Sequence, residues 1–117
     1  MQHYGFALAL RDDPAAIERY KAEHRHAWPE VNRRLREIGI TQMKIFLLGR
    51  RLFMYMEAID GFDPARAFPR LADDPRYRAW DALMRSMQER VLEAREGEWW
   101  AQMEEVFDLN WPSAAQR

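Results

Sequence analysis

The first apolar stretch of the chain, residues 3–10, alternates between bulky and small side chains. The bulky set of alternate positions consists of Tyr4, Phe6, Leu8 and Leu10, and the other set consists of His3, Gly5, Ala7 and Ala9. Successive side chains of a β-strand point to opposite faces, so this alternation predicts a strand. The small face predicts that another group, a packed element or a ligand, approaches this strand closely.

The next apolar residues are spaced three and four positions apart, as on one face of a helix. They are Ile17, Tyr20, His24, Ala27, Trp28, Val31, Leu35 and Ile38. Asp13-Pro14 is typical of a helix start, and Gly39 is typical of the residue that follows a helix end. Pro29 lacks an N–H, and its ring clashes with the carbonyl four residues earlier. The helix should therefore kink or break near Trp28–Pro29.

Two further apolar runs, 41–48 and 52–59, flank Gly49-Arg50-Arg51 and predict a β-hairpin. The Asp-Pro signal recurs twice, at Asp63-Pro64 and at Asp74-Pro75. The first of these begins a short helix over 63–72, which Pro69 interrupts.

The second begins a longer helix that we expect to run from Pro75 to about Ala94. Residues 102–109 predict a last strand, and 111–117 predict a loose tail.

The predicted order is β-α-β-β-α-β, an α+β ferredoxin-like plait forming one domain over residues 1–110. Two helices cover only one face of a four-stranded sheet. The other face would carry Met, Phe and Leu side chains of the second and third strands. An uncovered apolar face predicts a face-to-face dimer or a deep ligand site, and we favour both together.

Composition excludes several classes of function. The 18 basic and 19 acidic residues are mixed along the chain, which argues against a nucleic-acid partner. The chain has no cysteine, so disulfides, thiolate nucleophiles and thiolate metal sites are excluded. No signal-peptide pattern precedes the first strand, and no apolar run approaches the ~20 residues that cross a bilayer. We therefore expect a cytoplasmic protein without a membrane partner.

His24 is the candidate for proton-transfer chemistry. It lies on the apolar stripe one turn after Tyr20, whereas His26 points about 200° away around the helix. Phosphate-binding glycine loops, nucleophile elbows and evident carboxylate pairs are missing from the sequence. Proton transfer near neutral pH remains, and histidine suits it. A lone inward histidine is nevertheless more often a core residue, as are aromatic residues such as Tyr20 and Trp80, so spacing alone does not define an active site.

The segment Tyr20-Lys-Ala-Glu-His24-Arg-His-Ala-Trp28-Pro29-Glu30 resembles the first-helix motif of the L-rhamnose mutarotase family. The resemblance extends over nearly the whole chain. It includes Phe6-Ala-Leu, Gly39-Ile40, Ile45-Phe46-Leu47, Leu52-Phe53, Arg78-x-Trp80 and Glu105-Val106-Phe107.

The resemblance implies a homodimeric α+β barrel that holds a monosaccharide between sheet and helices, with no metal or cofactor. It assigns the catalytic acid/base to His24 and a sugar contact to Tyr20. The family's late-helix tryptophan pair falls on Ala79 and Trp80, and its second-strand tyrosine falls on Met43, so one tryptophan and one tyrosine are missing. Because a pocket that loses a hydrogen-bonding group changes its preference, we expect a first substrate other than L-rhamnose. The resemblance implies L-fucose, on which relatives in this superfamily act and whose methyl group suits an apolar wall, with L-rhamnose as the next.

The expected reaction is therefore exchange of the α and β anomers of a 6-deoxyhexose by ring opening. His24 would give its proton to the ring oxygen, and the second proton-handling group, for which water is one option, stays open. Two alternatives remain at this point. One is a barrel of the same type that binds a small ligand without catalysis, and the other is a cofactor-independent monooxygenase of that barrel type.

Overall fold

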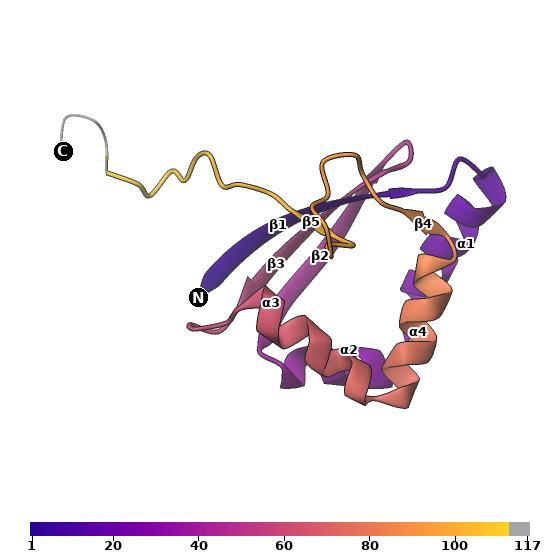
Figure 1. Cartoon of the computed structure of the whole chain (residues 1–117), viewed down its shortest axis with the longest axis horizontal. Coiled ribbons are helices and arrows are strands. Elements are labelled where there is room, and N and C mark those ends of the chain that lie inside the picture. Colours follow the sequence, from indigo (N-terminus) through magenta and orange to yellow (C-terminus); the bar gives the residue numbers. More distant parts are fainter. Residues whose placement is uncertain (113–117) are drawn as a thin grey trace.

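A curled antiparallel sheet carries the fold in the computed structural model, which describes residues 1–112 (Figure 1). Its strands are β1 (Gln2–Leu10), β2 (Ile40–Leu48), β3 (Arg51–Ala58), β4 (Gln88–Glu89) and β5 (Ala101–Gln102). The spatial order is β2-β3-β1-β4, and β5 also pairs with β1. The helices are α1 (Pro14–Arg25), α2 (Pro29–Glu37), α3 (Pro64–Ala67), the 3₁₀ helix η1 (Phe68–Asp73) and α4 (Pro75–Arg85). The α+β class and the ferredoxin-like order are confirmed.

The two faces of β1 follow the predicted alternation. Leu8 and Leu10 are fully buried beneath the helices. On the opposite face, a Cβ added to Gly5 would lie 3.0 Å from the ring of Phe53 on β3. The small residue at this position therefore allows close packing of a neighbouring side chain across the sheet.

All three Asp-Pro pairs begin helices, as predicted. In each pair the aspartate side chain accepts a hydrogen bond from a backbone N–H of the first turn, and the proline occupies the first helical position. The bonds are Asp13 with Ala15 (3.0 Å), Asp63 with Ala65 (3.1 Å) and Asp74 with Arg76 (2.8 Å).

The helical stripe breaks at Pro29, so α1 and α2 are separate helices. Trp28 precedes the proline with φ −66° and ψ 129°, the extended conformation that a following proline imposes. Gly39 follows the end of α2 with φ +111°, and a Cβ there would lie 2.9 Å from Ile59. Glycine is therefore favoured at this position both by the positive φ and by the close approach of the Ile59 side chain.

The prediction that the late helix runs to Ala94 is wrong, because α4 ends at Arg85. The apolar residues beyond this point do not share one face. Met87 packs with Leu8 and Leu10 under the helices, whereas Val91 packs with Ala9, whose side chain leaves β1 on the other side. A continued helix would not reach both sides of the sheet, and the chain instead forms β4 along β1.

The predicted last strand over 102–109 is also corrected, since β5 covers only Ala101–Gln102. After the N–H of Met103 donates to the Gly5 carbonyl at 2.8 Å, the chain leaves the sheet edge as an arm (Figure 1). Val106, Phe107 and Leu109 are 78%, 70% and 83% exposed on this arm. These apolar residues lack a partner strand among the described residues, so the prediction of a strand fails beyond Gln102. Residues 113–117 of the predicted tail lie outside the described residues.

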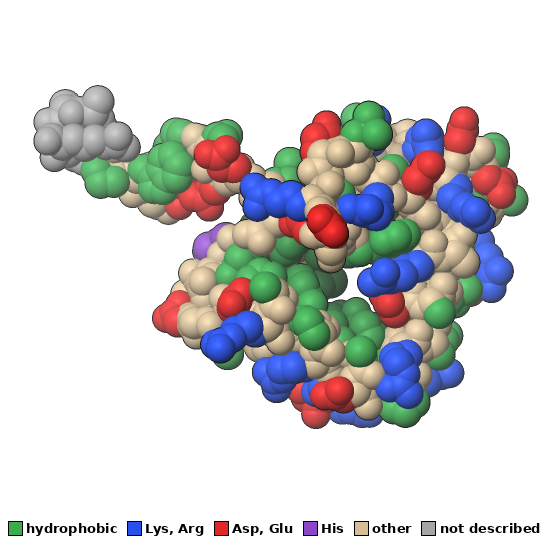
Figure 2. Space-filling model, in the orientation of Figure 1, with side chains coloured by type: hydrophobic (Ala, Val, Ile, Leu, Met, Phe, Trp, Pro, Cys, Tyr) green, Lys and Arg blue, Asp and Glu red, His purple; other side chains and the backbone are tan. Residues whose placement is uncertain are grey.

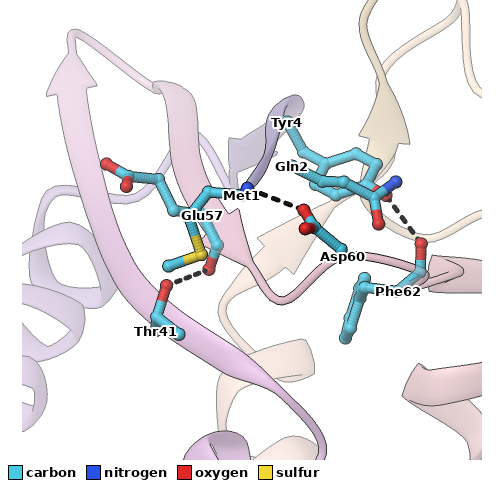
Figure 3. A network of polar contacts seen from close by, with 7 residues as sticks. All are labelled: Met1, Gln2, Tyr4, Thr41, Glu57, Asp60 and Phe62. Carbon is cyan, nitrogen blue, oxygen red and sulfur yellow. Dashed lines mark hydrogen bonds and ion pairs between the residues drawn. The ribbon is translucent and has the colours of Figure 1, made fainter.

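Polar contacts fasten the start of β1 to the segment that follows β3 (Figure 3). The N-terminal ammonium lies 2.7 Å from the Asp60 carboxylate. The hydroxyl of Tyr4 donates to the carbonyl of Phe62 at 2.9 Å, and the amide of Gln2 donates to that hydroxyl at 3.1 Å. These bonds tie the start of β1 to residues 60–62.

The sheet face turned away from the helices carries exposed apolar side chains, in line with the predicted uncovered face. Phe46 and Leu48 of β2 are 54% and 83% exposed, and Phe53 of β3 is 40% exposed. The methionines of these strands point the other way, because Met54 and Met56 are buried in the core and Met43 packs against it. Within residues 1–112, no helix has both the length and the apolar character to cross a membrane.

Candidate active site

A cavity of about 1250 Å³ opens between the sheet and the helices α1, α2 and α4. Figure 2 shows this hollow near the middle of the molecule, with hydrophobic side chains around it and basic side chains at its rim. Its polar lining includes Tyr20, His24 and Gln88, and its apolar lining includes Met43 and Trp80. The structure therefore brings four of the predicted site residues, Tyr20, His24, Met43 and Trp80, to one hollow.

Tyr20, His24 and Trp80 form a contiguous aromatic cluster on the cavity wall. The ring of His24 lies 4.3 Å from that of Tyr20 and 5.3 Å from that of Trp80, measured between centroids. The first two residues face the same way because they are one turn apart on α1. Trp80 comes from α4, which packs across α2, so two helices share in building the site.

The hydrogen bond of the His24 ring fixes its tautomer. Nδ1 lies 2.8 Å from the backbone carbonyl of Tyr20, and a carbonyl can only accept, so Nδ1 carries the hydrogen. Burial lowers the pKa of His24 below its ordinary value, although the bond to the Tyr20 carbonyl and the charge of Glu23 act the other way. At neutral pH the ring is thus neutral, and Nε2 holds a free lone pair.

The other two histidines lie elsewhere. His26 is exposed and caps the end of α1, and the ring of His3 bonds the hydroxyl of Tyr55 at 2.8 Å on the outer face of the sheet. Neither lines the cavity, so His24 supplies the imidazole of the site within the described part of the chain.

Tyr20 is 4% exposed, and its hydroxyl accepts a hydrogen bond from Nε2 of Gln88 at 3.2 Å. Burial raises the pKa of Tyr20 to about 12, with the Gln88 bond acting slightly in the opposite direction. The phenol therefore keeps its proton throughout the physiological range. It can give a hydrogen bond, but it does not act as an anion.

Trp80 is held from behind by a second tryptophan, Trp28, at 5.2 Å between ring centroids. These two rings meet edge to face, and the guanidinium of Arg76 lies 3.7 Å from the centre of the Trp28 ring. Met43 is half-buried on the sheet side of the cavity. Ala79, by contrast, is exposed on α4 and does not line the cavity, so the structure does not bring it to the site.

Sequence reasoning missed Gln88 and the tryptophans of the connection between β4 and β5. Trp99 and Trp100 both line the cavity, and the indole N–H of Trp99 donates to Oε1 of Gln88 at 2.8 Å. The guanidinium of Arg85 lies 4.7 Å from the Trp99 ring and pairs with Asp81 at 2.9 Å. The adjacent tryptophans after Gly97 were a usable signal, because two large aromatics in a loop seldom lack a packing or binding role.

Acidic and imidazole groups do not converge in this structure as metal ligands do. Among residues 1–112, no three His, Cys, Asp or Glu side chains are grouped in this way. The cavity is also lined by a second buried tyrosine, Tyr77, and by charged side chains that include Asp81, Arg85 and Glu98. Beside the aromatic cluster it offers one neutral imidazole, that of His24, and the protonated phenol of Tyr20. Such a set suits proton exchange with a small polyhydroxylated molecule.

Comparisons with known proteins define the class first. The chain superimposes on an L-rhamnose mutarotase from Formosa agariphila with a TM-score of 0.68 and 20% identity, covering 93% of this chain and 99% of that one. It superimposes equally well on tetracenomycin F2 cyclase from Streptomyces glaucescens, with a TM-score of 0.69 and 17% identity over 96% and 100% of the two chains. At these identities the similarity establishes the fold, which is of the dimeric α+β barrel type.

Sequence similarity then defines the family. The family model described as L-rhamnose mutarotase matches residues 3–109. An L-fucose mutarotase from Xanthomonas campestris pv. campestris is 39% identical over 112 residues, 94% of this chain and 90% of the relative. A UPF0734 protein from Dictyostelium discoideum is 46% identical over 112 residues, 92% of this chain and 90% of that protein. The chain belongs to the L-rhamnose mutarotase family of sugar mutarotases, as its first-helix motif predicted.

Proposed function

We propose that this protein interconverts the α and β anomers of a 6-deoxyhexose pyranose, with L-fucose preferred and L-rhamnose next. One observation carries the proposal. His24 is neutral, its Nδ1 hydrogen is committed to a backbone carbonyl, and its ring lines a cavity large enough for a sugar. A histidine packed only for the core would not line such a cavity.

The chemistry follows from the protonation states of His24 and Tyr20. Nε2 of His24 takes the proton of the anomeric hydroxyl as the bond between C1 and the ring oxygen breaks, and the Tyr20 hydroxyl donates a hydrogen bond to the ring oxygen, which carries the developing negative charge. The aldehyde rotates about the bond to C2, and closure on its other face runs the same steps in reverse. The sequence suggested His24 as the acid toward the ring oxygen. The neutral tautomer favours it as the base in ring opening, and it returns the proton on closure.

The choice of sugar rests on the sheet side of the cavity. The inward residues of β2 that line it are apolar, namely Met43, Ile45 and Leu47. An apolar wall suits the methyl group of a 6-deoxyhexose, and the missing hydroxyl at Met43 disfavours a sugar that requires a hydrogen bond there. The relative from Xanthomonas campestris, which bears the name L-fucose mutarotase, supports the same choice.

Saturation-transfer NMR between the two anomeric protons tests the proposal directly. The wild-type protein should accelerate exchange of L-fucose most, L-rhamnose less, and D-glucose least. His24→Ala should remove the acceleration, whereas His26→Ala, which changes an exposed histidine two residues away, should retain it. Binding of L-fucose without exchange would instead support a barrel that only binds its ligand, and catalysis by His24→Ala would refute the assigned base.

We also propose that the working form is a cytoplasmic homodimer. The exposed Phe46, Leu48 and Phe53 form an apolar sheet face, and the arm after Met103 carries four more exposed apolar side chains, Val106, Phe107, Leu109 and Trp111, away from the body of the chain. A second copy is the natural occupant, because two such arms can exchange symmetrically and each can lie along its partner's sheet. Analytical ultracentrifugation should give twice the mass of one chain.

A further inference from the structure

Gln88 is the one buried polar or charged residue of the described chain, with 7% of its surface exposed. Its amide joins two parts of the cavity wall. Oε1 accepts from the Trp99 indole at 2.8 Å, and Nε2 donates to the Tyr20 hydroxyl at 3.2 Å. Burying an amide costs free energy unless its groups are hydrogen-bonded, so such a residue in a core is retained for a bond that an apolar side chain cannot make.

The chemistry of the three groups gives this chain of bonds a direction. An indole nitrogen can only donate, so the atom of Gln88 that faces Trp99 must be the carbonyl oxygen. The amide nitrogen therefore faces Tyr20, and it too can only donate. The Tyr20 oxygen is thus an acceptor on this side, and its own hydrogen must point elsewhere. The open direction is the cavity that Tyr20 lines.

We propose that Gln88, oriented by Trp99, is a positioning residue that keeps the Tyr20 hydroxyl as a hydrogen-bond donor into the sugar cavity. This inference rests on the proposed mutarotase function and deepens it, since it assigns the group that meets the ring oxygen while His24 handles the proton. Tyr20 touches the sugar, and Gln88 acts through Tyr20. The bond from Gln88 also draws electron density from the phenol oxygen, which makes its hydrogen a better donor.

Gln88→Glu tests the direction of the relay with almost no change of shape. An ionised carboxylate accepts from both Trp99 and Tyr20, so the phenol hydrogen would turn away from the cavity. A protonated carboxyl keeps one O–H and can still donate to the Tyr20 oxygen. Because burial raises the pKa of a carboxyl group, the protonated form should return as the pH falls. Exchange by this variant should be roughly 100-fold slower than wild type near pH 8 and should recover about tenfold relative to wild type near pH 5.5.

The ratio of the exchange rate of Gln88→Glu to that of the wild type, measured at each pH, isolates this effect. The other titratable or charged groups around the cavity, including His24, Asp81, Arg85 and Glu98, are present in both proteins. If the new carboxylate acted only by raising the pKa of His24, the ratio would fall at low pH instead of rising. The two explanations therefore predict opposite slopes.

Gln2→Glu is the matched control, because Gln2 also donates from a β-strand to a tyrosine hydroxyl, that of Tyr4, outside the cavity. Its exchange rate should equal wild type at every pH. Gln88→Met keeps the size and removes the donor, so the phenol rotates freely and exchange should fall about tenfold without a new pH dependence. Gln88→Met also keeps the inference testable if Gln88→Glu does not fold.

Two results would overturn the inference. One is a ratio for Gln88→Glu that is flat or falls as the pH decreases, and the other is wild-type exchange by folded Gln88→Met. Failure of the wild-type protein to exchange any sugar is a different result, which refutes the proposed function itself. The indole N–H resonance of Trp99 reports the relay without activity, and it should shift in Gln88→Met but not in Gln2→Glu.

Discussion

Removal of one oxygen atom, by Tyr20→Phe, separates the catalytic and structural roles of this tyrosine. The substitution leaves Nε2 of Gln88 without its partner at a position that is 7% exposed. An unsatisfied buried donor costs about 1–3 kcal/mol. For a domain of this size that corresponds to a drop of roughly 4–15 °C in Tm. Loss of the hydrogen-bond donor to the ring oxygen should at the same time slow anomer exchange by roughly 100-fold, since water is a poorly placed substitute.

Tyr4→Phe is the matched control for this experiment. The Tyr4 hydroxyl also makes two hydrogen bonds, to the Phe62 carbonyl and from Gln2, but it lies outside the cavity (Figure 3). Its loss should lower Tm and leave the exchange rate per folded molecule at the wild-type value. Thermal unfolding followed by circular dichroism and saturation-transfer NMR supply the two measurements. If Tyr20→Phe exchanges anomers as fast as Tyr4→Phe, Tyr20 is a core tyrosine and the reasoning fails.

Three further predictions concern pH, the cavity wall and assembly. Because burial holds the pKa of His24 below the ~6.5 of an unfolded histidine, the unfolded state binds more protons just below that pH. Urea unfolding should therefore show stability decreasing as the pH falls through this window, and His24→Ala should remove that part of the slope. Met43→Tyr adds a hydroxyl to the sheet wall and should raise the ratio of L-rhamnose to L-fucose exchange by about tenfold; an unchanged ratio refutes the assigned wall. Phe46→Lys with Leu48→Lys should convert the dimer to monomers in ultracentrifugation, and a persistent dimer would place the interface elsewhere.

Most of the fold was predictable because its signals are local. Each Asp-Pro pair fixes a helix start through a cap within its own first turn, and Pro29 breaks the helix through a clash with its own preceding turn. The end of α4 was not predictable in this way. Val91 and Met87 have helical spacing, but they pack on different sides of the sheet, which depends on a pairing with β1 nearly 80 positions earlier.

The candidate site was predictable only in part for a related reason. Tyr20 and His24 are neighbours on one helix, so periodicity places them together. Gln88 joins Tyr20 across 68 positions of sequence and Trp99 across 11, and no periodic pattern marks those contacts. The sequence could not predict the tautomer of His24 either, because the tautomer follows from the distance between Nδ1 and the Tyr20 carbonyl oxygen in the folded chain.

The fold alone does not explain why this chain should act on a sugar, since a polyketide cyclase shares the architecture at a TM-score of 0.69. The distinction lies in what each element contributes to the cavity. In the proposed mechanism the groups that act on the sugar belong to α1, where Gln88 orients Tyr20, whereas the proposed substrate wall includes β2. Substitutions on β2 should then change which sugar is exchanged while leaving the best rate nearly intact. Substitutions at Tyr20, His24 or Gln88 should slow every sugar by a similar factor, because all pyranoses open through the same anomeric hydroxyl and ring oxygen.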